Sequence, residues 1–117
     1  MSNVTLYHNP RCSKSRQALQ LLQENGIEPQ LRLYLDNPPS RDELITLLAQ
    51  LDIEPRALMR QGEAEYKDNH LGDPALSNDQ LIDALVRYPR LIERPIAIRG
   101  AKAVIGRPPE NVLELLG

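Results

Sequence analysis

Apolar and polar positions alternate along the chain in a way that predicts four short strands. Residues 4–7 form an alternating apolar run, and residues 31–35 carry a leucine at every second position, which is typical of half-buried strands. Two further apolar runs, at 96–98 and 103–105, are separated by a short segment around Gly100. Such a pair of runs favours an antiparallel hairpin.

Helical periodicity governs most of the remaining chain. Residues 13–25 place small and apolar side chains on one face, and Gly26 follows where a left-handed residue commonly ends a helix. The pair Pro108-Pro109 suits the start of a last, leucine-rich helix. A shorter helix is expected at 56–61, and a polar helix or a turn at 63–69.

Two capping boxes mark helix starts in the middle of the chain. In each, a serine is followed three residues later by a side chain that can return a hydrogen bond to the serine N–H. The two pairs are Ser40 with Glu43 and Ser77 with Gln80. We therefore expect a mostly helical block at about 40–88, between the second and third strands.

This order of elements predicts an α/β fold with one mixed sheet. The strand, helix and strand at 4–35 normally form a right-handed crossover with parallel strands, and the hairpin adds antiparallel ones. A four-stranded sheet of this kind covered by helices is the thioredoxin-like arrangement, here with a helical insertion between strands 2 and 3. The chain of 117 residues suits a single domain over 1–117. In this arrangement the proline before the third strand often follows a cis peptide bond, so Arg94-Pro95 is a candidate.

The only cysteine, Cys12, lies in the loop between the first strand and the first helix. The first turn of a helix has unpaired N–H groups and the positive end of the dipole, so a thiol there has a lowered pKa and an oxyanion can bind beside it. Nearby positive charge would come from Arg11, Lys14, Arg16 and His8. A free cysteine is often a small buried hydrophobe instead. The polar neighbours of Cys12 favour the reactive thiol.

The composition excludes several classes of function. A net charge of −2 and a pI of about 5.7 provide no general attraction to nucleic acid or anionic membranes. A single cysteine rules out an internal disulfide framework, and no apolar stretch approaches the roughly 18 residues of a membrane helix. The Met1-Ser2-Asn3 start shows no signal peptide, and no spacing of His, Cys, Asp and Glu suggests a metal site. We expect a soluble, cytoplasmic monomer that binds neither nucleic acid nor membrane.

The residues around the cysteine form a motif that is found in a known family. His8-Asn9-Pro10-x-Cys12-x-x-Ser15-Arg16 resembles the active-site loop of the ArsC family, the glutaredoxin-linked arsenate reductases. Further segments match that family in the same order: Tyr34-Leu35-x-x-Pro38-Pro39-x-Arg41-Asp42-Glu43-Leu44, Arg56-Ala57-Leu58-x-Arg60, Leu81-Ile82-Asp83, Leu91-Ile92-x-Arg94-Pro95-Ile96 and Gly106-Arg107-Pro108. The resemblance therefore extends from residue 2 to about 116.

Two features distinguish the chain from the usual family pattern. Ser13-Lys14 follow the cysteine where the family's arsenate reductases usually carry Gly-Thr or a similar small pair. The chain also ends at Gly117, where those enzymes continue. We therefore expect a shorter branch of the family, in which Lys14 helps to bind the anion or serves another substrate, such as a glutathionylated protein.

The resemblance implies a role for four residues. In the family, the cysteine at the position of Cys12 attacks arsenate. For this chain, the resemblance implies arsenate or a similar oxyanion as the substrate. Three arginines hold the oxyanion and the thiolated intermediates, and they correspond to Arg60, Arg94 and Arg107. Guanidinium groups suit this role because they bind tetrahedral oxyanions through paired, charge-assisted N–H bonds.

The resemblance also implies supporting residues and an external reductant. His8 and Ser15 match the family's supporting positions, where they would tune or hydrogen-bond the sulfur. Reduction of arsenate to arsenite needs two electrons and hence a second thiol, and this chain has no second cysteine. The family relationship implies glutathione as the co-substrate, with glutaredoxin clearing the mixed disulfide at Cys12 by thiol exchange. No bound cofactor is expected, and the activity would serve arsenic detoxification.

Two other functions are compatible with the same residues. Cys12-Ser13-Lys14-Ser15 has the Cys-x-x-Ser form of monothiol glutaredoxins, which predicts a thiol–disulfide oxidoreductase that removes glutathione from proteins. The Spx-type transcriptional regulators are similar in fold and bind RNA polymerase without being enzymes. Those that sense redox state use Cys-x-x-Cys, and Ser15 at the second position argues against that mechanism here.

Overall fold

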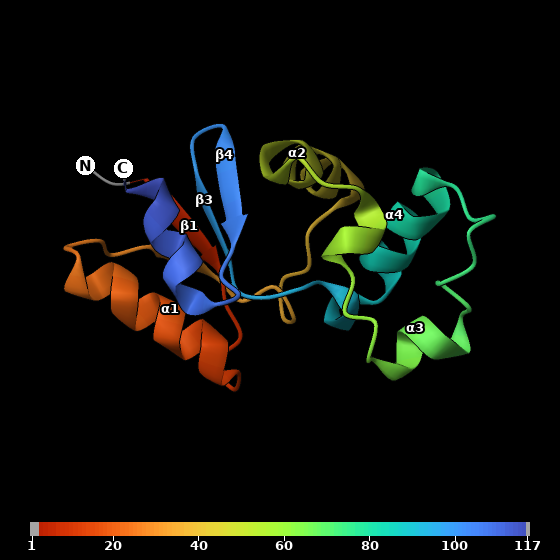
Figure 1. The fold of residues 1–117 in the computed structure, drawn as a ribbon, viewed down its shortest axis with the longest axis horizontal. Coiled ribbons are helices and arrows are strands. Elements are labelled where there is room, and N and C mark those ends of the chain that lie inside the picture. Colours follow the sequence, from red (N-terminus) through yellow and green to blue (C-terminus); the bar gives the residue numbers. More distant parts are fainter. Residues whose placement is uncertain (1–2, 117) are drawn as a thin grey trace. The chain divides into compact units, whose positions relative to one another are not determined.

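The chain forms two compact units. The computed structural model describes residues 3–116, so Met1 and Ser2, which contribute to the expectation of no signal peptide, lie outside the described residues. The first unit contains the sheet and comprises the chain up to Asn37 and again from Arg94, and the second is Pro38–Glu93 (Figure 1). The helical block predicted at about 40–88 is thus a separate compact unit between the second and third strands. That the whole chain is one domain stays a prediction.

Four strands form one mixed sheet in the first unit. They are β1 (Val4–Tyr7), β2 (Gln30–Arg32), β3 (Ile96–Arg99) and β4 (Lys102–Ile105). Their order is β2-β1-β3-β4, with β1 parallel to β2 and antiparallel to β3. In this register Leu6 lies opposite Leu31 on one side and Ala97 on the other. The predicted parallel pairing of β1 with β2 and the predicted β3–β4 hairpin are both confirmed.

The second strand is shorter and less buried than the leucine alternation predicts. β2 ends at Arg32, and Leu31, Leu33 and Leu35 are 44, 39 and 41% exposed. Tyr34 is buried instead and stacks on Tyr7, with ring centroids 6.2 Å apart. The prediction of a buried leucine face was therefore wrong. An edge strand is paired on one side only, and burying the larger aromatic ring turns the leucines on either side of it outward.

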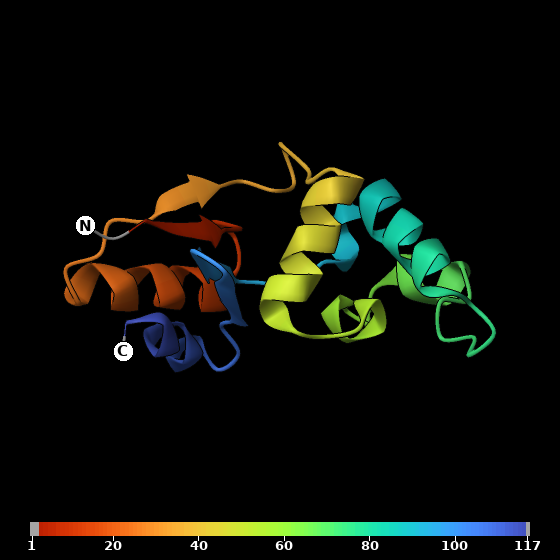
Figure 2. The same cartoon turned by 90° about the horizontal axis from the view of Figure 1, so that it is seen from above.

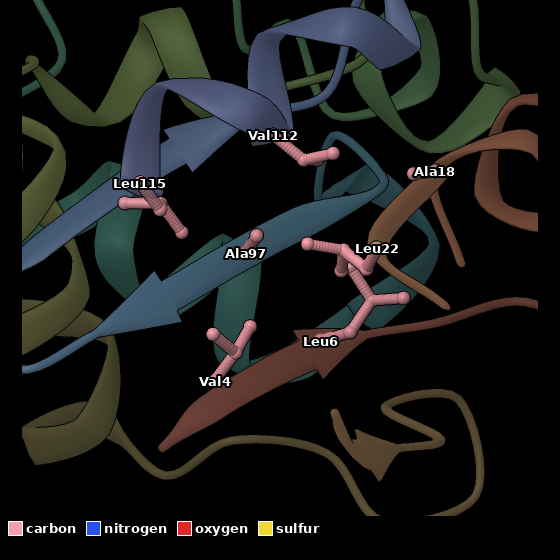
Figure 3. Packing of buried hydrophobic residues seen from close by; sticks show 7 residues of the cluster. All are labelled: Val4, Leu6, Ala18, Leu22, Ala97, Val112 and Leu115. Carbon is pink, nitrogen blue, oxygen red and sulfur yellow. The ribbon is translucent and has the colours of Figure 1, made fainter. Parts of the chain in front are cut away.

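The core of the sheet unit lies under two helices. These are α1 (Ser13–Glu24) and the 3₁₀ helix η3 (Pro109–Leu115), which pack side by side (Figure 2). Both cover one face of the sheet, and Figure 3 shows the buried side chains gathered between them and strands β1 and β3: Val4, Leu6, Ala18, Leu22, Ala97, Val112 and Leu115. Gly26 follows the helix with φ of +80°, as predicted.

Two helices of the helical unit begin at the predicted capping boxes. Its elements are α2 (Arg41–Leu51), η1 (Pro55–Leu58), α3 (Ala64–Asp68), α4 (Asn78–Arg87) and η2 (Pro89–Leu91). Both capping boxes form: the Ser40 hydroxyl accepts from Glu43 N, and the Ser77 hydroxyl accepts from Gln80 N, each at 3.2 Å. Within residues 3–116, no helix is long and apolar enough to cross a membrane.

Two segments of the sheet unit approach closely at Gly106, just after β4. Gly106 N donates to Pro95 O at 2.8 Å. A Cβ on Gly106 would lie 2.8 Å from Pro95 Cγ and 3.1 Å from Val112 Cγ1, so only glycine allows this contact. The peptide bond before Pro95, which the sequence marks as a candidate, is cis, and so is the bond between Arg107 and Pro108. Arg94 and Arg107, each adjacent to one of the touching residues, are thereby brought together.

Gly106→Ala should destabilise the sheet unit. The added methyl group would have to displace Pro95 and Val112, and overpacking of this kind typically costs about 1–3 kcal/mol. Gly62→Ala is the matched control because nothing lies within 4 Å of a Cβ at that position, so its effect should stay within about 0.5 kcal/mol. The midpoint of urea unfolding, followed by circular dichroism, measures both. Equal midpoints for Gly106→Ala and the wild type would show that the contact is not as tight as described.

Candidate active site around Cys12

The thiol of Cys12 lies at the N-terminus of α1. Cys12 is the N-cap residue, and its carbonyl accepts the first helical hydrogen bond from Arg16 N at 3.1 Å. The loop before it is a tight turn, in which Cys12 N donates to Asn9 O at 2.9 Å and Asn9 Oδ1 accepts from Arg11 N at 3.0 Å. Cys12 is only 9% exposed. The backbone therefore fixes the sulfur at the helix terminus, where the sequence predicts it.

Hydrogen bonds and charge around the sulfur favour its thiolate. Burial alone would raise the pKa of Cys12, but backbone N–H groups of Ser15 and Lys14 and the Ser15 hydroxyl donate to the sulfur, and the positive charge of Arg107 lies nearby. Together these interactions outweigh burial and hold the pKa of the Cys12 thiol below its ordinary value. More of the sulfur is therefore an active nucleophile at neutral pH than in a free cysteine.

Two of the three predicted arginines belong to the same unit as the cysteine. Arg107 Nη2 lies 4.0 Å from Cys12 Sγ, and Arg107 Nε donates to Arg94 O at 2.8 Å. The second bond fixes the guanidinium group beside the sulfur. Arg94 is partly buried, and its Nε and Nη1 atoms are out of contact with solvent. The structure thus brings Cys12, Arg107 and the segment that carries Arg94 together.

Arg60 lies in the helical unit, after η1. Its backbone N donates to Leu91 O at 2.7 Å, beside an antiparallel bridge between neighbouring residues. Its guanidinium group forms ion pairs with Glu63, at 3.3 Å, and with Glu93, at 3.9 Å. Because Arg60 and Cys12 belong to different units, a shared anion site stays a prediction from the family resemblance.

Ser15 and His8 are both buried but differ in their effect on the thiol. Ser15 is fully buried, accepts from Asn9 N at 3.4 Å and donates to the Cys12 sulfur, so it connects the turn to the nucleophile. Burial and the charge of Arg16 lower the pKa of His8, so its imidazole is neutral at pH 7. The expectation that His8 adds positive charge was therefore wrong, because sequence does not reveal how deeply a histidine is buried.

Arg16 stabilises the loop rather than the anion site. Its Nη1 donates to Pro10 O at 2.9 Å, which holds the side chain against the loop before Cys12. Among the described residues, no group of three or more His, Cys, Asp or Glu side chains could hold a metal ion.

A cavity of about 300 Å³ adjoins the cysteine loop. Its lining residues are His8, Asn9, Pro10, Arg11, Leu33, Leu35 and Asp36. The cavity is not predicted from the sequence, because the alternating leucines indicate a buried strand face. Asp36-Asn37, which directly follow Leu35, could have indicated an exposed turn here, because acidic and amide residues are typical of turns.

Fold and site together define a class of protein: thioredoxin-like proteins with a single cysteine at the start of the first helix. A thioredoxin-like sheet carries one cysteine at the first turn of its first helix, and a guanidinium group lies beside the sulfur. Such a site can attack an electrophile and bind an anion at the same place.

Comparison with known proteins identifies the family. The model of the ArsC family matches residues 7–115. The uncharacterized protein YfgD of Escherichia coli K12 is 53% identical over 115 residues, covering 97% of both chains, and an arsenate reductase of Escherichia coli is 45% identical over 116 residues, covering 99% of this chain and 82% of the relative. The solved structure of arsenate reductase from Vibrio cholerae superposes with a TM-score of 0.94, at 51% identity and 97% coverage of both chains. The chain belongs to the ArsC family.

Arg107→Gln should raise the pKa of the Cys12 thiol, because it removes the positive charge beside the sulfur. The rate of alkylation by iodoacetamide, measured against pH, reports this pKa directly. For the wild type the midpoint should lie below that of a free cysteine, and for the variant it should move upward, so that alkylation at pH 7 becomes slower. Arg11→Gln is the control, because this exposed neighbour does not contribute to the shift and should leave the midpoint in place. An unchanged midpoint in Arg107→Gln would contradict the electrostatic account.

Proposed function

We propose that the protein is an arsenate reductase that uses Cys12 as its nucleophile. The observation that carries this proposal is the Cys12 thiol itself, which has a lowered pKa and lies 4.0 Å from the Arg107 guanidinium. Relatives at 42–45% identity named arsenate reductase support the choice of arsenate as the oxyanion. We also propose a monomer as the active form, because the composition gives no strong reason to expect an obligate oligomer.

The first step joins sulfur to arsenic. Arg107 and Arg94 bind arsenate oxygens through charge-assisted hydrogen bonds. A contribution of Arg60 to binding the anion rests on the family resemblance alone. The Cys12 thiolate then attacks the arsenic atom, an As–S bond forms and one As–O bond breaks. The displaced oxygen takes up protons and leaves as water. Arsenic remains in the +5 state at this stage.

The second step transfers two electrons and needs a thiol from outside, because the chain has one cysteine. A glutathione thiolate attacks the Cys12 sulfur, so an S–S bond forms and the S–As bond breaks. The electron pair of the broken bond stays on arsenic, which leaves as arsenite in the +3 state. A glutaredoxin thiolate then attacks the glutathione sulfur and releases the Cys12 thiolate. We propose the cytoplasm as the location, because its reducing thiol pool would sustain this cycle.

The proposed function predicts arsenate-dependent NADPH consumption in an assay coupled through glutathione, glutaredoxin and glutathione reductase. Cys12→Ser should abolish it. Arg94→Gln and Arg60→Gln should each raise the KM for arsenate, because losing one charge-assisted hydrogen bond costs about 1.5–3 kcal/mol. That range corresponds to roughly a 10- to 150-fold change. Arg87→Gln, which removes an exposed arginine from α4, should leave the KM unchanged.

Two outcomes would contradict the proposal. Arsenate reduction that survives Cys12→Ser would exclude a Cys12–arsenic intermediate. Removal of glutathione from proteins at a substantial rate, with no arsenate-dependent turnover, would assign the thiol to a monothiol thiol–disulfide oxidoreductase instead.

A further inference from the structure

The cavity beside the cysteine loop lies next to the segment that carries Cys12, on the side of β2. Asn9 and Arg11 line it, and Asn9 O accepts the hydrogen bond from Cys12 N at 2.9 Å. Arg11 is the residue directly before Cys12, so their Cα atoms are about 3.8 Å apart. The cavity therefore begins one residue away from the nucleophile. Arg94 and Arg107 instead flank β3 and β4, on the other side of β1 in the sheet.

The lining of the cavity combines charges of both signs with apolar surface. Arg11 supplies a guanidinium group and Asp36 a carboxylate, while Leu33 and Leu35 expose about two-fifths of their surface. A carboxylate repels a second arsenate ion, so the cavity does not simply extend the anion site. It suits a ligand that carries both a carboxylate and an ammonium group, joined by a chain with apolar segments.

One further polar group in the wall lacks a partner. His8 is 5% exposed, and its Nδ1 has no hydrogen-bond partner among the described residues. Buried polar atoms in folded proteins are nearly always paired. An unpaired imidazole nitrogen in a cavity wall indicates that the partner comes from outside the chain.

The volume and position of the cavity match a small peptide thiol. About 300 Å³ lies at the lower end of the roughly 300–1,000 Å³ of small-molecule sites. An extended tripeptide spans roughly 10 Å, which is long enough to reach from the cavity to the adjacent cysteine. Glutathione has this length, carries carboxylates and an ammonium group, and places its thiol in the middle residue.

We propose that this cavity, lined by Arg11, Leu33, Leu35 and Asp36, binds the glutathione whose thiol attacks Cys12. The inference rests on the proposed function, because that function requires an external thiol. Arg11 pairs with a carboxylate of glutathione and Asp36 with its ammonium group, while the two leucines cover its methylene segments. The bound thiol then attacks the Cys12 sulfur, forming the S–S bond and leaving the S–As electron pair on arsenic.

Binding of S-methylglutathione to the Cys12→Ser protein tests the inference without arsenate and without turnover. NMR titration should show saturable shifts at the cavity. In the Cys12→Ser background, Leu33→Gln and Asp36→Asn should each raise the Kd at least fivefold. Leu31→Gln is the matched control, because this leucine is equally exposed on the same edge but does not line the cavity, and its Kd should stay unchanged. Since no arsenate is present, this result is independent of whether the protein reduces arsenate.

A second measurement uses the wild-type thiol, which attacks one sulfur of glutathione disulfide and releases the other as a thiolate. Asp36→Asn should slow this reaction at least threefold and leave the reaction with 2-hydroxyethyl disulfide unchanged, because the latter has neither carboxylate nor ammonium groups. Absence of saturable S-methylglutathione binding, or equal Kd values in all variants, would overturn the inference. Unchanged Kd values together with a raised KM for glutaredoxin in Leu33→Gln would also overturn it and assign the surface to the protein partner.

Discussion

The hydrogen bonds from the first turn of α1 to the Cys12 sulfur are the interaction on which the site depends. Cys12 is only 9% exposed, and burial by itself would favour the neutral thiol, which is a poor nucleophile. The Ser15 hydroxyl and the charge of Arg107 help to reverse this preference, and the largest contributions come from the backbone N–H groups of Ser15 and Lys14. They are fixed by the helix, so they need no reorganisation when charge develops on the sulfur.

The rest of the sheet unit holds that helix terminus in place. Ala18 and Leu22 anchor α1 in the core of the sheet, and the turn from Asn9 sets the position of the cysteine. On the other side, the close contact at Gly106 brings Arg107 to the sulfur. Nucleophile and cation therefore come from opposite ends of the sequence and meet only because the sheet places β1 beside β3.

Local signals made most of the fold predictable from the sequence. The strand at Val4–Tyr7, both capping boxes and the hairpin depend on neighbouring residues, and all of them were predicted correctly. The errors concern burial. Tyr34 takes the buried position that the leucine alternation suggests for its neighbours, and His8 is too deeply buried to be charged. The contact at Gly106 was not predictable either, because it joins segments that the sequence alone does not place together.

In the proposed mechanism, one cysteine and one external thiol share the two-electron reduction. The most direct test is the intact mass of the reduced protein after incubation with arsenate and glutathione, without glutaredoxin. The account predicts a single round of reduction, in which each protein molecule releases one arsenite and retains one glutathione in a disulfide with Cys12. Arsenite formation that proceeds without any glutathione adduct and continues undiminished in Cys12→Ser would contradict it, because the electrons would then not pass through the Cys12 sulfur.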